Sequence, residues 1–511
     1  MPRVYVKKLL KHDETTIQSA LKEIREGEKI NTIAKKYNIP RGTLRGRIEK
    51  ETSLKKYFLK AAAIFHGFSY TAARQLAYEY AVSLKSKGQI SYIPPSWKGT
   101  VSGQKGSASK DWMLSFMRRH PDLSLRKPQA TSLGRATAFN EHNVSMFFTK
   151  LKDVIERFNI NPENIWNMDE TALTTVQKPV AVIAQRGVRN IGSITSAERG
   201  VLVTLALAVS ATGVYHFLTS AGFGADGAAN ASGWMQAEQF TKFLVHFKRF
   251  AHPSVEVPVL LILDNHESHL TIAGLDFCKE NGIIVLSLPP HTSHKLQPLD
   301  KGVFGPIKRH FNAACDNWMR LPMNAAKTIT MHDIPGIAQE PIQKGASILN
   351  IQAGFRVTGI FPLNDSIFTE EDFLPSEVTN RSPEDSLPVT DEVPNVEQEM
   401  ANHVETEDQE NDVVNLDSLI ENVRPFPKAA PRKISNRGRK RRKCAILTDS
   451  EEMEALRLEQ ETAAQNKLRK TKASSERVKR KILREANKSK TSQASSSDTK
   501  RGRGRPRKTD C

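Results

Sequence analysis

The most regular pattern of hydrophobic positions lies in the middle of the chain. An apolar run of strand length, Val257 to Leu263, ends at Asp264, and a second apolar run covers Ile283 to Leu288. Between them, Leu270 to Glu280 has apolar residues at helical spacing. Because both strands are apolar throughout, we expect them to be buried on both faces. The pattern predicts a β-α-β unit of a parallel sheet, whose ligands gather at the carboxyl ends of the strands.

The flanking pattern extends this unit into an α/β domain over residues 140–365. The expected amphipathic helices are Asn140–Phe158, Ala237–Ala251 and Lys301–Trp318. The expected strands are Ile165–Met168, Val180–Ile183, Val201–Val209 and Val214–Leu218.

The apolar pattern in residues 1–50 predicts an all-helical unit. Apolar stripes that begin near Glu14 and are separated by Gly27 and by a turn at Asn38 to Pro40 indicate three short helices. The third helix carries four candidate DNA-binding residues, Arg41, Thr43, Arg45 and Arg47. This is the arrangement of a helix-turn-helix, whose third helix enters a major groove where Arg reads guanine. A plain three-helix bundle with a solvated basic face is the alternative.

Residues 51–130 predict a second helical unit with a basic edge. The expected helices lie in Leu54 to Lys87 and in Lys110 to Pro128, on either side of a loop rich in Pro, Gly and Ser. The expected core residues of the later helix are Trp112, Leu114, Phe116 and Met117. Arg119 and Arg126 are candidates for DNA contacts on its basic edge. Two such units in tandem would cover a longer DNA site than one.

Charge separates the rest of the chain into two segments. Residues 370–423 contain 17 acidic residues and one Arg, and the remainder of the chain carries +35. We expect an acidic disordered linker over 366–423 and a basic disordered tail over 424–511, within which 451–487 has a helical composition. The excess of positive charge indicates a polyanionic partner, most often nucleic acid.

The basic tail holds two short motifs. Arg437 to Lys443 reads RGRKRRK, which has the form of a nuclear import signal. The end of the chain, RGRGRPRK, resembles an AT-hook, in which Arg503 and Arg505 would enter the minor groove of A·T-rich DNA. Arg507 is a further candidate for DNA binding in this run. The expected location is the nucleus.

Other features argue against alternative classes of protein. The four cysteines are far apart in the sequence, which argues against disulfides and against a cysteine zinc site, and indicates a reducing compartment. No apolar run approaches the roughly 20 residues of a membrane span, and the N-terminus lacks an apolar signal segment. We expect no membrane partner and no small-molecule cofactor.

Three acidic residues carry the candidate chemistry. Asp169, Asp264 and Asp300 each lie at or just beyond the end of a predicted strand or the loop after it. If they converge, their mutual repulsion calls for a cation, and two Mg²⁺ ions about 3.5–4 Å apart can hold a phosphoryl displacement in line. The alternative is that they cap turns or helices. His266 and His269, with no Cys nearby, favour structural roles over a zinc site.

Three sequence blocks also carry a resemblance. NMDET at Asn167 to Thr171, LDNHESH at Leu263 to His269, and LPPHTSHKLQPLDKGVFGPIK at Leu288 to Lys308 resemble the catalytic blocks of pogo/Tigger-like transposases of the DDE superfamily. The jerky-like and centromere protein B-like host proteins are similar too. Residues 1–50 resemble the pipsqueak-type helix-turn-helix of these proteins, and residues 51–130 their centromere protein B-type helix-turn-helix.

The resemblance implies a fold class and a function. The fold would be an α/β RNase H-like core, preceded by all-α tandem helix-turn-helix domains. Asp169, Asp264 and Asp300 would be the catalytic, metal-binding trio of a DNA endonuclease and strand transferase that uses two Mg²⁺ or Mn²⁺ ions. The partners would be double-stranded DNA and, as an option, a second copy of the chain.

One departure leaves a second function open. Where many members have Ala-Pro, this chain has His266-Glu267, which places it nearer the jerky-like branch. That branch includes former transposases kept by the host. The alternative is therefore a catalytically silent DNA-binding, chromatin or transcriptional regulator on the same fold.

Overall fold

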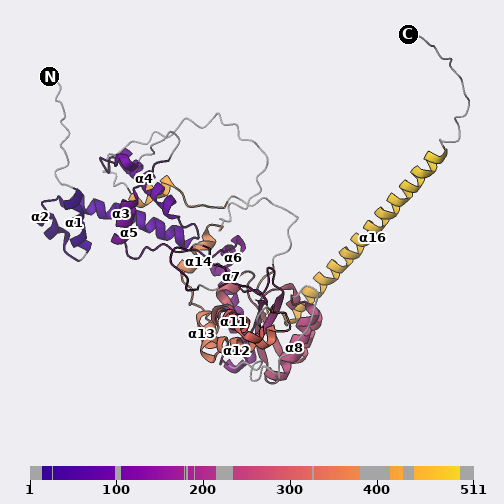
Figure 1. The fold of residues 1–511 in the computed structure, drawn as a ribbon. Coiled ribbons are helices and arrows are strands. Elements are labelled where there is room, and N and C mark those ends of the chain that lie inside the picture. Colours follow the sequence, from indigo (N-terminus) through magenta and orange to yellow (C-terminus); the bar gives the residue numbers. More distant parts are fainter. Residues whose placement is uncertain are drawn as a thin grey trace, which may run out of the picture. The chain divides into compact units, whose positions relative to one another are not determined.

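A computed structural model describes residues 14–25, 27–97, 105–177, 179, 182–188, 190–213, 234–324, 327–379, 415–429 and 442–494 (Figure 1). The chain divides into two compact units, which are taken separately below. Unit 1 comprises residues 1–149, 289–297 and 355–443, and unit 2 comprises residues 150–288, 298–354 and 444–511.

Unit 2 is built on a mixed sheet whose described strands have the order β2-β1-β3-β4. The strands are β1 (Ile165–Thr174), β2 (Leu202–Ser210), β3 (Val259–Leu263) and β4 (Ile283–Ser287). β1 pairs antiparallel with β2 and parallel with β3, and β3 pairs parallel with β4. Helix α9 (Ile272–Glu280) joins β3 to β4. The predicted β-α-β unit is confirmed, and every residue of β3 and β4 is buried.

The first strand is longer than its apolar run. We expected it to end at Met168, but β1 continues to Thr174 because its antiparallel pairing with β2 continues after its pairing with β3 stops at Asn167. The strand predicted at 180–183 is wrong for its described residues. Val182 and Ile183 are exposed and unpaired with any strand, after a proline that lacks the N–H of a sheet ladder. The strand predicted at 214–218 lies outside the described residues.

Helices cover this sheet. Those that lie in unit 2, or cross into it, are α7 (Glu141–Phe158), η2 (Pro162–Asn164), α8 (Ala237–Ala251), η4 (Glu267–His269), the π-helix η5 (Leu299–Val303), α11 (Phe304–Arg320), η6 (Pro322–Asn324), α12 (Ile334–Gly345), α13 (Ile348–Val357) and α16 (Ser450–Ala494). The predicted helices α7, α8 and α11 are confirmed. Phe240, Leu244 and Phe247 of α8 share one buried cluster with Leu261 of β3 and Val285 of β4.

The predicted disorder of the C-terminal tail is wrong where the chain returns to the sheet. Ala445 accepts a hydrogen bond from the Ser287 N–H at 2.9 Å, and the Leu447 N–H donates to Val285 at 2.8 Å. α16 follows as a long helix (Figure 1). Its Met453 and Leu456 are buried in the cluster that includes α8, and its described side chains beyond Glu461 are exposed. The segment stays ordered because it supplies a partner to the edge of β4 and apolar side chains to the core.

Unit 1 is helical, as predicted. Its helices are α1 (Glu14–Arg25), α2 (Ile30–Lys36), α3 (Arg41–Ala63), α4 (Tyr70–Ser86), η1 (Pro95–Trp97), α5 (Lys110–Arg119), α6 (Leu133–Ala138), α10 (Ser293–Leu296), α14 (Glu370–Glu377) and α15 (Leu416–Val423). Gly27 and Asn38 have positive φ at the two turns between the first three helices.

Helices α1 to α5 contribute to two separate hydrophobic clusters. One joins α1, α2 and the start of α3 through residues such as Leu21, Ile33 and Leu44. The other joins the end of α3 to α4 and α5. α3 runs unbroken through both, so the boundary that we placed between residues 50 and 51 falls inside one helix. Within α5, Phe116 is buried as expected, whereas Leu114 is 47% exposed, contrary to our expectation.

The predicted acidic linker also contains ordered helices. α14 begins with a capping box between Thr369 and Asp372. α15 buries Leu419 and Ile420 against the second cluster. We predicted disorder from the charge of the segment and missed these helices. A capping box in α14 and two buried apolar residues in α15 are enough to order short helices that pack on a partner surface.

Candidate active site

The carboxyl end of the parallel strands brings the three candidate acids into electrostatic range. Asp264 directly follows β3. Asp169 lies in β1, two residues after Asn167, which is the last residue of β1 that pairs with β3. Continuing the register from the Asn167–Ile262 pair places Asp169 opposite Asp264. Asp300 lies in η5. The sheet therefore positions two of the acids on neighbouring strands, and a separate helical turn supplies the third.

The charges of these acids affect one another. Asp169 is only 9% exposed, and burial together with the negative charges of Asp300 and Asp264 raises its pKa to about 8. A carboxyl group with this environment is stabilised in its neutral form until an opposite charge arrives.

A buried asparagine ties the three segments of the site together. The Asn167 side chain is fully buried, and its amide nitrogen donates to the Ile262 carbonyl at 3.0 Å. Its amide oxygen accepts the N–H of Leu299 at 3.1 Å. One side chain on β1 thus fixes β3 two residues before Asp264 and η5 one residue before Asp300. Sequence reasoning missed this role, although a polar residue within an apolar strand was its signal.

A buried histidine lies between two carboxylates. The Nδ1 of His269 is 3.0 Å from Asp264 Oδ1, and its Nε2 is 3.0 Å from Glu170 Oε1. Burial alone would lower the pKa of His269, but the hydrogen bonds to Asp264 and Glu170 outweigh it and raise the pKa to about 10. Burial opposes ionisation of Asp264 as well, and the hydrogen bond from His269 outweighs it and lowers the pKa of Asp264.

This contact fits the structural role that we favoured for His269 over a zinc site. His269 neutralises Glu170 and fixes the orientation of Asp264. Glu170 was not among the residues singled out from the sequence, because only its position after Asp169 in NMDET marked it.

The donor set suits a hard divalent cation. Carboxylate oxygens are the ligands that Mg²⁺ and Mn²⁺ prefer, and the raised pKa of Asp169 reports a repulsion that a cation would remove. In the arrangement described here, no three His, Cys, Asp or Glu side chains of the described residues already converge closely enough to hold an ion. Asp300 is exposed, whereas Asp264 is half-buried and Asp169 is buried.

The candidate DNA-binding residues of α3 lie on its first two turns. Arg41, Thr43 and Arg45 are exposed, and Arg47 is half-buried. Arg45 pairs with Glu49 at 2.9 Å, one turn along the helix, with both side chains at least half exposed. An exposed pair of this kind contributes only about 0.2–1 kcal/mol, so it can be replaced by a contact with DNA.

Arg119 and Arg126 differ from each other. Arg119 donates two hydrogen bonds to the Glu51 carboxylate at 3.1 and 2.8 Å, and both side chains are 14% exposed. Its guanidinium is thus occupied inside unit 1. Arg126 is exposed and bonds only locally, to Ser124 at 3.1 Å. Arg503, Arg505 and Arg507 lie outside the described residues, as does most of the basic cluster at 437–443.

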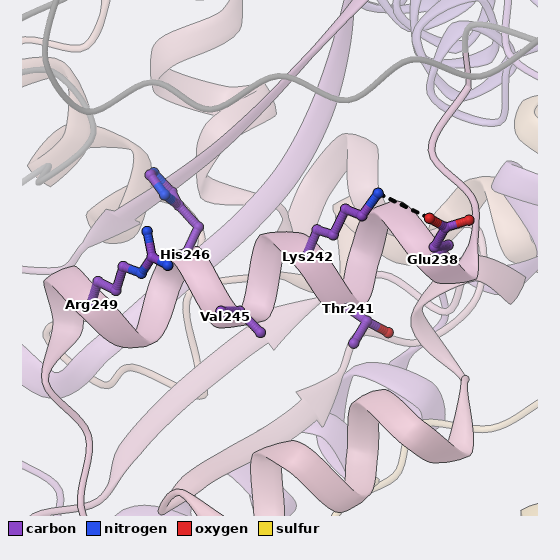
Figure 2. A pocket seen from close by; sticks show the side chains of 6 residues that line it. All are labelled: Glu238, Thr241, Lys242, Val245, His246 and Arg249. Atoms are coloured by element: carbon purple, nitrogen blue, oxygen red, sulfur yellow. Dashed lines mark ion pairs between the residues drawn. The ribbon is translucent and has the colours of Figure 1, made fainter.

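One surface hollow, of about 410 Å³, is lined by none of the three acids. It follows one side of α8, where Lys242 pairs with Glu238 at 2.9 Å (Figure 2). Its lining residues are Glu238, Thr241, Lys242, Val245, His246 and Arg249. Because a single helix supplies all of them, the hollow is open and does not form an enclosed ligand site.

Comparison with known proteins gives a partial match by sequence. A protein of Cochliobolus lunatus named MFS-type transporter clz9 is 36% identical over 141 residues, which cover 27% of this chain and 15% of that protein. In the part of this chain that the structure describes, no helix is both long and apolar enough to cross a bilayer.

Solved structures of Mos1 transposase show a distant likeness. The Mos1 strand transfer complex is 13% identical, with 66% of this chain and 99% of that chain covered and a TM-score of 0.30. The Mos1 mariner paired end complex with Mn is also 13% identical, with 69% and 95% covered and a TM-score of 0.32.

The clearest match is to a family profile. Residues 212–351 match the family described as DDE superfamily endonuclease. Two of the three acids, Asp264 and Asp300, lie inside the matched residues, and Asp169 lies before them. The chain therefore carries, over residues 212–351, a DDE superfamily endonuclease domain.

Proposed function

We propose that this protein is a DNA-binding endonuclease and strand transferase of the pogo/Tigger-like transposases, with an RNase H-like core and tandem helix-turn-helix domains. One observation carries the proposal: Asp169 and Asp264 each lie two residues beyond the last parallel pair of the adjacent strands β1 and β3, and the negative charges of Asp264 and Asp300 act on Asp169. The three motif blocks at residues 167–171, 263–269 and 288–308 support the subfamily.

The residues of the site have separate roles in this proposal. Asp169, Asp264 and Asp300 would hold Mg²⁺ or Mn²⁺, which when bound supplies activation of water or a 3′-hydroxyl and stabilisation of the leaving oxygen. Asn167 keeps the segments that carry Asp264 and Asp300 together. His269 orients the Asp264 carboxylate and offsets the charge of Glu170.

Recognition of double-stranded DNA belongs to unit 1 in this proposal. Arg41, Thr43, Arg45 and Arg47 would enter the major groove, and Arg126 would contact phosphate. The cluster at 437–443 would direct nuclear import. The end of the chain from 501 to 508 would bind A·T-rich minor grooves. A tagged protein that lacks 437–443 and still enters the nucleus would exclude the import role.

The test is metal-dependent cleavage. A duplex selected from random sequences with the full chain is incubated with Mg²⁺ or Mn²⁺ and with wild type, Asp264→Asn or Asp153→Asn. Asp153 is exposed on α7 and serves as the matched control. We expect nicking by wild type and Asp153→Asn and none by Asp264→Asn. Tight specific binding without nicking by any variant would instead support a host regulator that no longer catalyses.

A further inference from the structure

Helix α15 fills a surface formed by α3 and α4 of unit 1. Leu419 and Ile420 of α15 are 8% and 1% exposed, and they join the buried cluster that contains Tyr57 and Leu76. The segment that follows continues the contact, because Phe426 stacks on Tyr57 with ring centroids 4.5 Å apart. Residues 415–429 thus occupy a site of their own on the N-terminal helices.

Polar contacts fix the position of this segment. The Tyr57 and Tyr80 hydroxyls donate to the carbonyls of Arg424 and Leu416. The Arg424 guanidinium donates to both carboxylate oxygens of Glu79, at 3.1 and 2.8 Å. Main-chain and side-chain contacts at both ends of α15 define one position and one direction for the helix.

Two acidic residues of α15 form ion pairs with two lysines of α3. Asp417 of α15 is 3.3 Å from Lys56 of α3, and Glu421, four residues later, is 3.3 Å from Lys60. The lysines are also four residues apart, so two successive turns of α15 meet two successive turns of α3. The docked segment therefore neutralises two cations of α3.

Those cations continue the basic surface that begins with the candidate recognition residues. At 100° per residue, Arg41, Arg45, Lys56 and Lys60 fall within about 100° of one another around α3. Lys56 and Lys60 lie roughly 16 and 22 Å beyond Arg45 at a rise of 1.5 Å per residue. All four are exposed, whereas Leu54, Tyr57 and Ala61 face the core. This side of α3 therefore carries four cations and the exposed Glu49, and the two lysines in its second half pair with acidic residues of α15.

We propose that the α3–α4 surface is a docking site for the chain's own segment 415–429, and that Lys56 and Lys60 are phosphate contacts that the carboxylates of Asp417 and Glu421 in this segment mask. The inference rests on the proposed DNA binding by unit 1. The carboxylates of Asp417 and Glu421 occupy the places that phosphates would take, so docking and DNA compete for the same two lysines. Removing the two acidic charges leaves the apolar contacts of Leu419 and Ile420 in place and frees the lysines.

The experiment compares full-length proteins on the selected duplex by fluorescence anisotropy. The variants are Asp417→Asn with Glu421→Gln, Lys56→Gln with Lys60→Gln, and all four changes together. The acid variant should bind about 2- to 30-fold tighter, since each exposed ion pair contributes about 0.2–1 kcal/mol. Its plot of log affinity against log salt should steepen by about 2, because two phosphate contacts are added. The lysine variant should bind like wild type, and the fourfold variant should show no gain.

A matched control removes two other acidic charges. Glu454 and Glu461 are exposed on α16 in unit 2. The variant Glu454→Gln with Glu461→Gln should leave the affinity for the duplex unchanged. Three results would overturn the inference: wild-type affinity of the acid variant, an equal gain in the control, or a gain that persists in the fourfold variant. If no protein, including the acid variant, binds any duplex, the proposed DNA binding fails, and the inference fails with it.

Discussion

Replacing Arg119 separates a structural role from a DNA-binding role at a predicted DNA contact whose partner, Glu51, is only 14% exposed. In Arg119→Met the Glu51 carboxylate, 14% exposed, would lose both of its hydrogen bonds from the guanidinium. Breaking a buried pair costs about 3–5 kcal/mol, and partial exposure favours the lower end, about 3 kcal/mol. This corresponds to a roughly 100-fold loss of protection against amide hydrogen exchange in α3 and α5.

The assay is hydrogen exchange with mass spectrometry on the full chain, together with DNA affinity. Arg118→Met is the control, because Arg118 is the exposed neighbour of Arg119 on α5. The pair Glu51→Leu with Arg119→Met should recover most of the protection, since apolar replacement of a buried ion pair is often neutral or stabilising. If Arg119→Met loses no more protection than Arg118→Met, the structural reasoning is refuted. If the doubly substituted protein is fully protected but has lost site-specific affinity, Arg119 contacts DNA as well.

Three further predictions concern unit 2. Asn167→Ala leaves the Ile262 carbonyl and the Leu299 N–H without their partner, and should lower stability by about 2–5 kcal/mol in chemical denaturation followed by circular dichroism. Leu456→Ala, 6% exposed in the sheet cluster, should cost about 2–4 kcal/mol, whereas Leu458→Ala, 65% exposed on the same helix, should change stability by less than about 0.5 kcal/mol. His269→Ala should cost about 3 kcal/mol, because it leaves Asp264 and Glu170 without the imidazolium, and His266→Ala, exposed on the same loop, should cost much less. Equal effects in either matched pair would contradict the corresponding contact.

The central part of the fold follows from local pattern. The runs at 257–263 and 283–288 are apolar throughout and are separated by a segment with helical spacing, so strand, helix and strand were each visible. The carboxyl ends of β3 and β4 were predicted to within one residue, and β3 begins two residues later than predicted. β1 was predicted too short, because three polar residues, Asp169 to Thr171, follow Met168 and end the apolar run. Pairing with β2, whose partner residues are 28 to 38 positions away, keeps this part of the strand extended.

The geometry of the site was less accessible from the sequence than its residues. Asp264 and Asp169 could be found, since each follows an apolar run. That Asn167 joins three segments depends on the strand order β1-β3 and on where η5 begins, and neither is encoded near Asn167. The contact of His269 with Glu170 likewise joins residues 99 positions apart. Spacing along the chain identifies residue types, while the sheet determines which of them meet.

Two ordered segments in the charged C-terminal part of the chain, residues 444–447 and α15, could not be predicted from local sequence at all. Residues 444–447 and α15 each contain only a few apolar residues, too few for a periodic signal, and their surroundings are charged. Each is ordered because a preformed surface receives it: the edge of β4 in one unit, and the α3–α4 surface in the other. The two surfaces differ in consequence. The edge of β4 has unpaired backbone groups and is completed by the added segment. The α3–α4 surface holds its segment by apolar contacts and by ion pairs, and Lys56 and Lys60 in those pairs are the residues for which DNA phosphates would compete in our proposal.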